Sequence, residues 1–148
     1  NAERCSYQVS FQSKSTFKMA WVGKKYKLEK SENFGDYMKA LGVGMMLRQV
    51  GNTVYPTVDL VKNGDEYSFT TSSTFKTTVI KFKEGEEFDE ETLDGRKIRS
   101  VITFDGDKMI HDQKGDKGHI IYRVFTETDL TVTMELDGIK VTRYYKAV

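Results

Sequence analysis

The sequence predicts a mainly-β protein: a ten-stranded antiparallel up-and-down β-barrel that a short helix-turn-helix caps. From Pro56 onward, apolar and polar residues alternate in short runs, which is the period of a half-buried strand. Turn-forming pairs such as Asp94-Gly95 and Asp137-Gly138 separate these runs, as the hairpins of a meander require. A helical period appears only ahead of Pro56, so the helices are expected to be few and short.

The elements before Pro56 are one strand and two short helices. The strand is expected over residues 23–30. The first helix has Asn33 as its expected N-cap, Gly42 as its stop, and an apolar stripe at spacings i, i+3, i+4 and i+7 formed by Phe34, Tyr37, Met38 and Leu41. A second helical piece over 45–50 is expected to end at Gly51-Asn52. Helices with so few turns cannot build a bundle, so they are expected to cover one mouth of a barrel.

Nine strands are expected after Pro56. Their inward faces are the apolar sets of the alternation: Val58 and Leu60; Tyr67, Phe69 and Thr71; Ile80 and Phe82; Ile98, Ile102 and Phe104; Met109, His111 and Gln113; Leu130, Val132, Met134 and Leu136. A meander of this length would leave two exposed edges unless it closed on itself. Closure removes that aggregation hazard, which favours a barrel over an open sheet.

Two arginines lie on faces that the alternation assigns to the interior. In the last expected strand, Arg143 and Tyr145 share the apolar face, and Arg123 takes the equivalent position two strands earlier. An unpaired charge removed from water costs many kcal/mol. Either an internal acid such as Asp94 or Glu135 pairs with each arginine, or the anion comes from outside the chain.

The interior is expected to hold a cavity. Ten strands enclose more space than the eight whose side chains nearly fill a barrel. The inward residues include polar ones, namely Thr71, His111 and Gln113, besides the arginines. A partly polar cavity with an apolar wall suits a long amphiphile with one anionic end.

Composition narrows the classes of function. The 148 residues carry a net charge of +1, so no broad basic field attracts nucleic acid, and no nucleic-acid partner is expected. A single cysteine, Cys5, excludes an intramolecular disulfide and favours a reducing compartment. No nucleophile motif, phosphate loop or dinucleotide fingerprint is present, and His111 and His119 have no partners at metal-ligand spacing. No catalytic residue, metal or cofactor is therefore expected.

Residues 1–18 differ in composition from the rest of the chain. They are rich in Ser, Gln and Lys, and strong patterning starts after Met19. They are expected to be an extension outside the domain, either a translation artefact or a flexible arm, with 19–148 as one domain. The competing interpretation is a docked strand through Tyr7, Val9 and Phe11.

The sequence from residue 20 to 148 resembles the intracellular lipid-binding proteins, specifically fatty acid-binding proteins of the heart and muscle type, with an invertebrate character. The resemblance rests on motifs at 23–38 (GKKYKLEKSENFGDYM), 39–44 (KALGVG), 48–49 (RQ), 56–57 (PT), 73–76 (STFK), 82–90 (FKEGEEFDE), 94–97 (DGRK) and 143–146 (RYYK). It implies a calycin-like barrel of ten strands with a helical cap, in agreement with the pattern of the strands.

The resemblance also implies a ligand site. Arg123, Arg143 and Tyr145 would hold the carboxylate of a long-chain fatty acid. The cavity and its portal would be lined by Phe34, Tyr37, Met38, Pro56, Val58, Ser73, Phe75, Asp94, Ile121 and Val132. Lys39 and Arg48 would lie at the portal, either as an ordinary solvated face or as a surface that steers the cap toward anionic membranes.

The expected function is non-catalytic binding and transport of long-chain fatty acids by a cytoplasmic monomer, with transient membrane contact through the helical cap. The alternative is a carrier of retinoic acid or another carboxylate isoprenoid, because such ligands can use the same arginine site.

Overall fold

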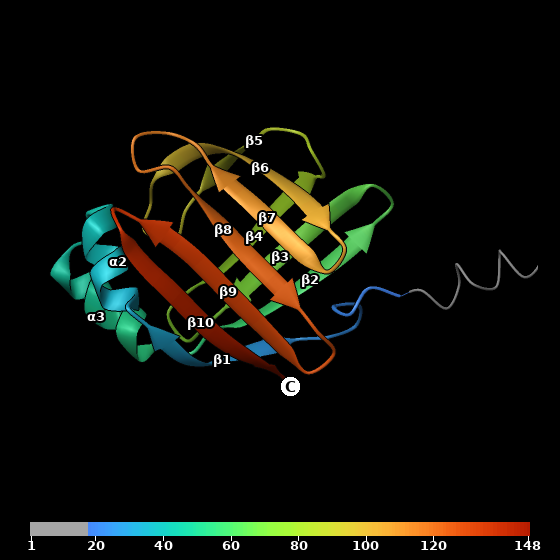
Figure 1. Ribbon diagram of the computed structural model, residues 1–148, viewed down its shortest axis with the longest axis horizontal. Helices are drawn as coiled ribbons and strands as arrows, with labels where there is room; N and C mark the ends of the chain where they lie inside the picture. The colour runs from blue at the N-terminus through green and yellow to red at the C-terminus, as the bar shows by residue number, and fades with distance from the viewer. Residues whose placement is uncertain (1–17) are drawn as a thin grey trace, which may run out of the picture.

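A computed structural model describes residues 18–148 and contains ten strands and two helices (Figure 1). The chain starts with β1 (Tyr26–Glu32), α2 (Phe34–Leu41) and α3 (Met45–Thr53). The remaining strands are β2 (Thr57–Asn63), β3 (Glu66–Ser72), β4 (Thr77–Lys83), β5 (Phe88–Glu91), β6 (Lys97–Asp105), β7 (Lys108–Gln113), β8 (His119–Phe125), β9 (Asp129–Leu136) and β10 (Ile139–Ala147). The predicted fold class is confirmed. The expected extension and the alternative strand through Tyr7, Val9 and Phe11 fall mostly or wholly outside the described residues.

The strands form one antiparallel sheet that curls into a nearly closed barrel. Their spatial order is β4-β3-β2-β1-β10-β9-β8-β7-β6-β5, so β1 joins the first hairpins to the last strand. The two ends of this order, β4 and β5, follow each other in the chain without pairing. The rings of Phe82 and Phe88 stack across that interruption with centroids 5.8 Å apart. Closure is therefore completed there by side chains rather than by a hydrogen-bonded ladder.

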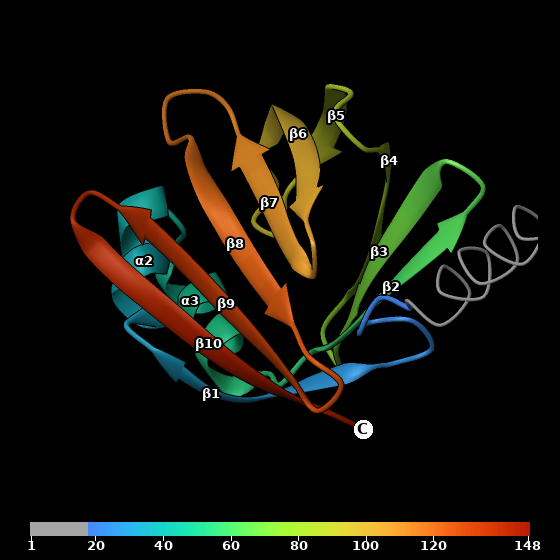
Figure 2. The ribbon, with the colours of Figure 1, turned by 45° about the vertical axis from the view of Figure 1, so that its right-hand side comes forward.

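Both helices lie at one end of the barrel (Figures 1 and 2). The first matches its expected range, and Gly42 ends it in the left-handed conformation, with φ of 88°. Asn33 occupies the N-cap position, as predicted, but its side chain makes no capping hydrogen bond to the helix. The residue has a φ of 62°, and its Nδ2 donates to the carbonyl of Lys140 at 2.9 Å, which ties the helix start to β10.

Two predicted boundaries were wrong. The second helix does not stop at Gly51-Asn52 but continues to Thr53, and the chain leaves it at Val54 in an extended conformation. The first strand starts at Tyr26 rather than at residue 23, because Gly23 lies in a preceding turn with φ of 71°. Neither helix in the described part of the chain is long and apolar enough to cross a membrane.

The barrel is solid at the end away from the helices. There Tyr67 stacks on Phe82 and Phe104, with centroids 5.2 and 4.7 Å apart, and Trp21 packs edge-on against Tyr67. Tyr26 is fully buried against Phe125 and donates its hydroxyl to the carbonyl of Thr126 at 2.7 Å. An aromatic plug at one end leaves the other end free to hold a cavity under the helices.

Candidate functional site

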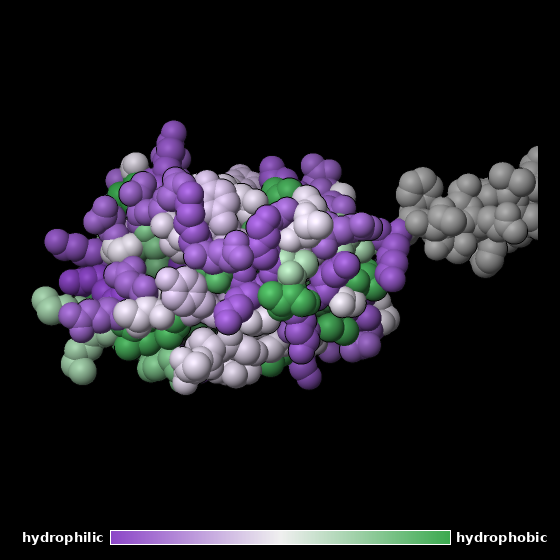
Figure 3. Space-filling model, turned by 90° about the horizontal axis from the view of Figure 1, so that it is seen from below, coloured by the Kyte–Doolittle hydropathy of each residue, from purple (hydrophilic) through white to green (hydrophobic). Residues whose placement is uncertain are grey.

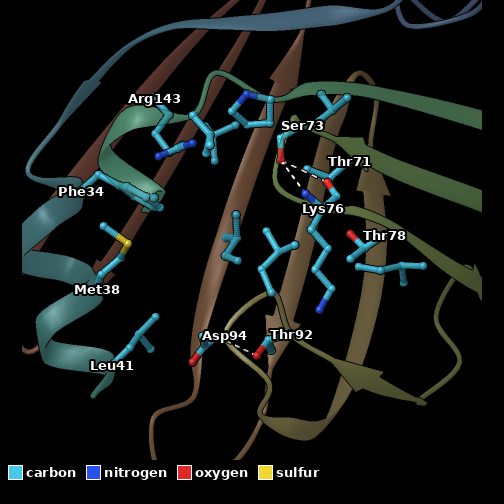
Figure 4. A pocket seen from close by; sticks show the side chains of 18 of the residues that line it. Phe34, Met38, Leu41, Thr71, Ser73, Lys76, Thr78, Thr92, Asp94 and Arg143 are labelled. Carbon is cyan, nitrogen blue, oxygen red and sulfur yellow. Dashed lines mark hydrogen bonds between the residues drawn. The ribbon is translucent and has the colours of Figure 1, made fainter. Parts of the chain in front are cut away.

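A cavity of about 260 Å³ lies inside the helical end of the barrel. Figure 4 shows α2 on one side of it, the β3–β4 turn opposite, and the turn between β5 and β6 at its edge. All thirteen residues that the resemblance assigned to the ligand site line this cavity: Phe34, Tyr37, Met38, Pro56, Val58, Ser73, Phe75, Asp94, Ile121, Arg123, Val132, Arg143 and Tyr145.

The strand register explains why the two arginines meet inside the barrel. Val132 in β9 pairs with Arg143 of β10 on one side and with Arg123 of β8 on the other. Directly opposed residues in an antiparallel sheet point to the same face. Arg143, Val132 and Arg123 therefore point to the same face of three neighbouring strands, and both guanidinium groups lie on the same wall of the cavity.

Arg143 is the less compensated of the two arginines. Its side chain is only 6% exposed, and its Nη1 is buried without a hydrogen-bond partner among the described residues. The guanidinium carbon lies 3.7 Å from the ring centroid of Phe34, so a residue of the helical cap covers the charge. Cation–π contact offsets part of the cost of desolvation but supplies no hydrogen-bond acceptor.

Arg123 has a partner. Its Nη1 donates to Nδ1 of His111 at 3.0 Å, and its guanidinium carbon lies 4.6 Å from the ring centroid of Phe69. Burial lowers the pKa of Arg123 from its ordinary value. Because arginine has no acceptor atoms, Nδ1 of His111 must accept this bond, and the proton of the neutral ring resides on Nε2.

His111 passes this interaction on to a buried acid. Its Nε2 donates to Oε1 of Glu90 at 2.7 Å, and the hydroxyl of Ser100 donates to the same oxygen at 2.8 Å. Burial is the largest influence on Glu90 and acts to raise its pKa, but the bonds from His111 and Ser100 outweigh it and lower the pKa. Burial also lowers the pKa of His111, which keeps the ring neutral.

Glu90 was not among the site residues expected from the sequence. The missed signal was the alternation itself, because Glu90 is in phase with Phe88 and Asp89 faces outward. Arg96, another cavity residue, was also not predicted.

The internal acids that the sequence analysis named as arginine partners do not fill that role. Asp94 binds Arg96 through Oδ2 at 2.8 Å and accepts the hydroxyl of Thr92 at 2.6 Å. Burial would raise the pKa of Asp94, but these two hydrogen bonds lower it. Glu135 is exposed on the outer face of β9. Neither Asp94 nor Glu135 pairs with Arg123 or Arg143, so these two acids were wrongly named. An internal acid does offset Arg123, but it is Glu90, which acts through His111.

Tyr37 connects the cap to the barrel. His119 donates from Nδ1 to the carbonyl of Lys117 at 2.9 Å, so its Nε2 accepts the hydroxyl of Tyr37 at 2.6 Å. Burial raises the pKa of Tyr37 to about 12, so the hydroxyl stays protonated. In contrast, the hydroxyl of Tyr145 makes no hydrogen bond within residues 18–148, although its side chain lines the cavity.

The remaining portal residues differ in what they contact. Ser73 uses its hydroxyl to accept the backbone N–H groups of Phe75 and Lys76, which closes the β3–β4 turn, and Phe75 itself is 54% exposed. Arg48 donates to the carbonyl of Val43 at 2.7 Å, so it stabilises the loop between the helices. Lys39 is exposed.

Apolar side chains gather on the surface at the helical end of the molecule (Figure 3). The first residues of α3 account for part of this surface, namely Met45, Met46 and Leu47, of which Met46 is 82% exposed. Among the described residues, no group of three or more His, Cys, Asp or Glu side chains is placed to hold a metal ion.

A ten-stranded barrel with a two-helix cap and an internal cavity lined by cationic side chains defines a calycin-like ligand-binding barrel. Residues 22–148 match the lipocalin / cytosolic fatty-acid binding protein family, and the chain belongs to that family.

Three relatives illustrate the likeness. The chain is 46% identical to a muscle fatty acid-binding protein of Schistocerca gregaria over 86% of this chain and 96% of the relative. The crystal structure of the fatty acid-binding protein from the brain of Drosophila melanogaster is 56% identical over 85% of this chain and 98% of that one, with a TM-score of 0.82. A Schistosoma mansoni fatty acid-binding protein in complex with arachidonic acid is 39% identical over 84% and 93% of the two chains, with a TM-score of 0.80. The resemblance to invertebrate members of the muscle type is confirmed.

Proposed function

We propose that this protein binds and carries long-chain fatty acids without chemically changing them, with the ligand carboxylate held by Arg143, Tyr145 and Arg123. The observation that carries the proposal is the buried Nη1 of Arg143, which has no acceptor among the described residues and lies at the wall of a largely apolar cavity. The names of the relatives from Schistocerca and Schistosoma support the same class of ligand.

The energetics divide between the two ends of the ligand. A carboxylate beside Arg143 and the hydroxyl of Tyr145 gains charge-assisted hydrogen bonds, which are about twice as strong as neutral ones. The acyl chain gains roughly 0.8 kcal/mol for each methylene group removed from water. Chain burial therefore supplies most of the affinity, while the arginines fix the orientation and select against uncharged headgroups.

The place of action belongs to the same proposal. The protein works as a cytoplasmic monomer that meets membranes transiently through its cap. The exposed side chains of Met45, Met46 and Leu47 give α3 an apolar surface beside the portal. Contact with a bilayer at this surface would bring the portal close to the lipid.

Two measurements test the proposed function. Mass spectrometry of lipid extracted from the purified protein should find unmodified long-chain fatty acids. A fluorescent fatty acid bound to the protein should be displaced by oleate at lower concentration than by retinoic acid. Displacement by retinoic acid alone would replace the proposal with the isoprenoid carrier, and a ligand recovered in altered form would indicate an enzyme.

A further inference from the structure

The cavity lining carries seven charged side chains. Four are cationic, namely Lys76, Arg96, Arg123 and Arg143, and three are acidic, namely Glu90, Glu91 and Asp94. Their sum is one net positive charge. This balance matters because charges in a low-dielectric interior interact far more strongly than they do in water.

Most charges in the cavity lining are either paired with a neighbouring opposite charge or exposed to solvent. Asp94 and Arg96 contact each other at 2.8 Å in the β5–β6 turn, and Lys76 and Glu91 are exposed. Glu90 is buried on β5, where it accepts bonds from Ser100, His111 and, at 3.4 Å, Gln113. The neutral His111 ring joins Glu90 to Arg123. One buried negative charge thus offsets one of the two arginines that line the cavity.

We infer that Glu90, acting through His111, sets the charge of the headgroup that this cavity accepts: it leaves one uncompensated cation, Arg143, and so selects a singly charged carboxylate over a doubly charged phosphate. The inference rests on the proposed function, since it concerns the same site. Glu90 is a specificity-determining residue that needs no contact with the ligand.

Two substitutions should have opposite effects on headgroup selection. Glu90→Gln keeps an oxygen that can accept from His111 but removes the negative charge, so the cavity gains an uncompensated cation. The affinity for a dianion should therefore rise more than the affinity for a monoanion. Arg123→Gln removes the paired cation and leaves Glu90 in place, so the dianion loses more than the monoanion.

The probes are oleate and oleyl phosphate, which share one hydrocarbon chain. At pH 8 the carboxylate carries one negative charge and the phosphate monoester nearly two, since the second phosphate pKa is about 6. Each probe displaces a fluorescent fatty acid, and the ratio of the two inhibition constants is the readout. Comparing this ratio between variants removes the contributions of chain length and headgroup size.

Wild type should favour oleate, and Glu90→Gln should shift the ratio toward oleyl phosphate by roughly 10-fold, the scale of one added charge interaction in a partly shielded interior. The matched control is Asp89→Asn, which removes the same charge from the neighbouring, outward-facing residue of β5 and should leave the ratio unchanged. If Glu90→Gln fails to fold, Glu90→Ser carries the test, because the smaller neutral residue also removes the charge and should shift the ratio in the same direction.

The outcomes separate the two proposals. Tight oleate binding with an unchanged ratio in both Glu90→Gln and Arg123→Gln would overturn the role of Glu90 and leave fatty acid binding intact. A ratio that moves equally in Asp89→Asn would also overturn it, because the effect would then come from overall charge. Failure of wild type to bind either probe would overturn both the function and the inference.

Discussion

At the scale of single residues, the two cavity arginines differ in their partners although the strand register places them as a pair. Arg123 is joined through His111 to Glu90, and Arg143 has only an aromatic ring over its guanidinium group. A buried charge without a counter-ion is unfavourable, and such groups concentrate where a ligand completes the site. The uncompensated arginine should therefore dominate both the binding and the instability of the empty cavity.

The first prediction concerns Arg143→Gln. This substitution should weaken oleate binding by roughly 1.5–3 kcal/mol, the scale of a hydrogen bond to a charged group. The ligand-free variant should also unfold at higher urea concentration than wild type, because a costly desolvated charge is gone. Displacement of a fluorescent fatty acid and equilibrium urea unfolding measure the two effects.

The control for this prediction is Arg99→Gln on the outer face, where the arginine pairs with Glu87 and Asp89 in solvent. It should leave oleate affinity as it is. An Arg143→Gln variant that binds oleate as tightly as wild type would remove Arg143 from the site.

The second prediction uses the pKa of His111, which burial lowers below its ordinary value of 6.5 even though the bond to Glu90 acts to raise it. Below that value the unfolded chain binds a proton that the folded protein does not, so lowering the pH favours unfolding. The free energy of unfolding should fall between pH 7.5 and pH 5 with a contribution of up to about 1.4 kcal/mol per pH unit.

The variant His111→Gln tests this contribution. Glutamine can accept from Arg123 and donate to Glu90, but it does not titrate, so the slope of unfolding free energy against pH should be shallower in this window. Urea unfolding at a series of pH values provides the measurement. Equal slopes for both proteins would mean that another group controls acid stability.

At the scale of elements, the end of α2 could be predicted from the sequence, but the end of α3 could not. The stripe at 34–41 determined α2 because its apolar spacing and the stop at Gly42 act locally. Gly51 was expected to end the second helix because glycine disfavours helices by about 1 kcal/mol. It nevertheless lies inside α3, where the sulfur of Met38 occupies the space that a side chain at residue 51 would need.

The third prediction follows from that contact. A Cβ at residue 51 would lie 2.6 Å from Sδ of Met38 and 3.1 Å from its Cε, so Gly51→Ala must displace the Met38 side chain, which lines the cavity. The intrinsic gain of alanine in a helix, about 1 kcal/mol, offsets part of the cost of this displacement. Stability should change little, while oleate affinity should fall several-fold.

Gly44→Ala is the matched control for Gly51→Ala. Gly44 precedes α3 with a φ of −65°, which alanine adopts readily, and nothing lies within 4 Å of its added Cβ. This variant should retain oleate affinity, measured by the same displacement assay. Equal affinities for the two glycine variants and wild type would show that Met38 moves without narrowing the cavity.

At the scale of the whole molecule, the alternation of the chain specified the barrel, its ten strands and the inward arginines. These features could be predicted because each follows from the alternation of apolar and polar residues within a single strand. Two features could not be predicted in this way. The inward position of Glu90 follows from the alternation, but its link to Arg123 through His111 depends on how β5, β7 and β8 are arranged in the sheet. The interruption between β4 and β5 depends on how the last strands curve back. Both are set by pairings between residues far apart in the sequence.

The fourth prediction concerns this interruption. The ladder between β9 and β10 runs without a break from Ile139 and Leu136 to Lys146 and Asp129, and β9 and β10 both have paired neighbours on each side. The strands β4 and β5 each have one unpaired edge, and only two residue pairs, formed by Tyr26 and Lys27, join β1 to β2. Local opening is easiest where few backbone bonds must break together.

Amide hydrogen exchange followed by mass spectrometry should therefore show the fastest strand exchange in β4 and β5 and the slowest in β9 and β10. Uniform protection of all ten strands would mean that the stacked rings of Phe82 and Phe88 close the barrel as firmly as a hydrogen-bonded ladder does.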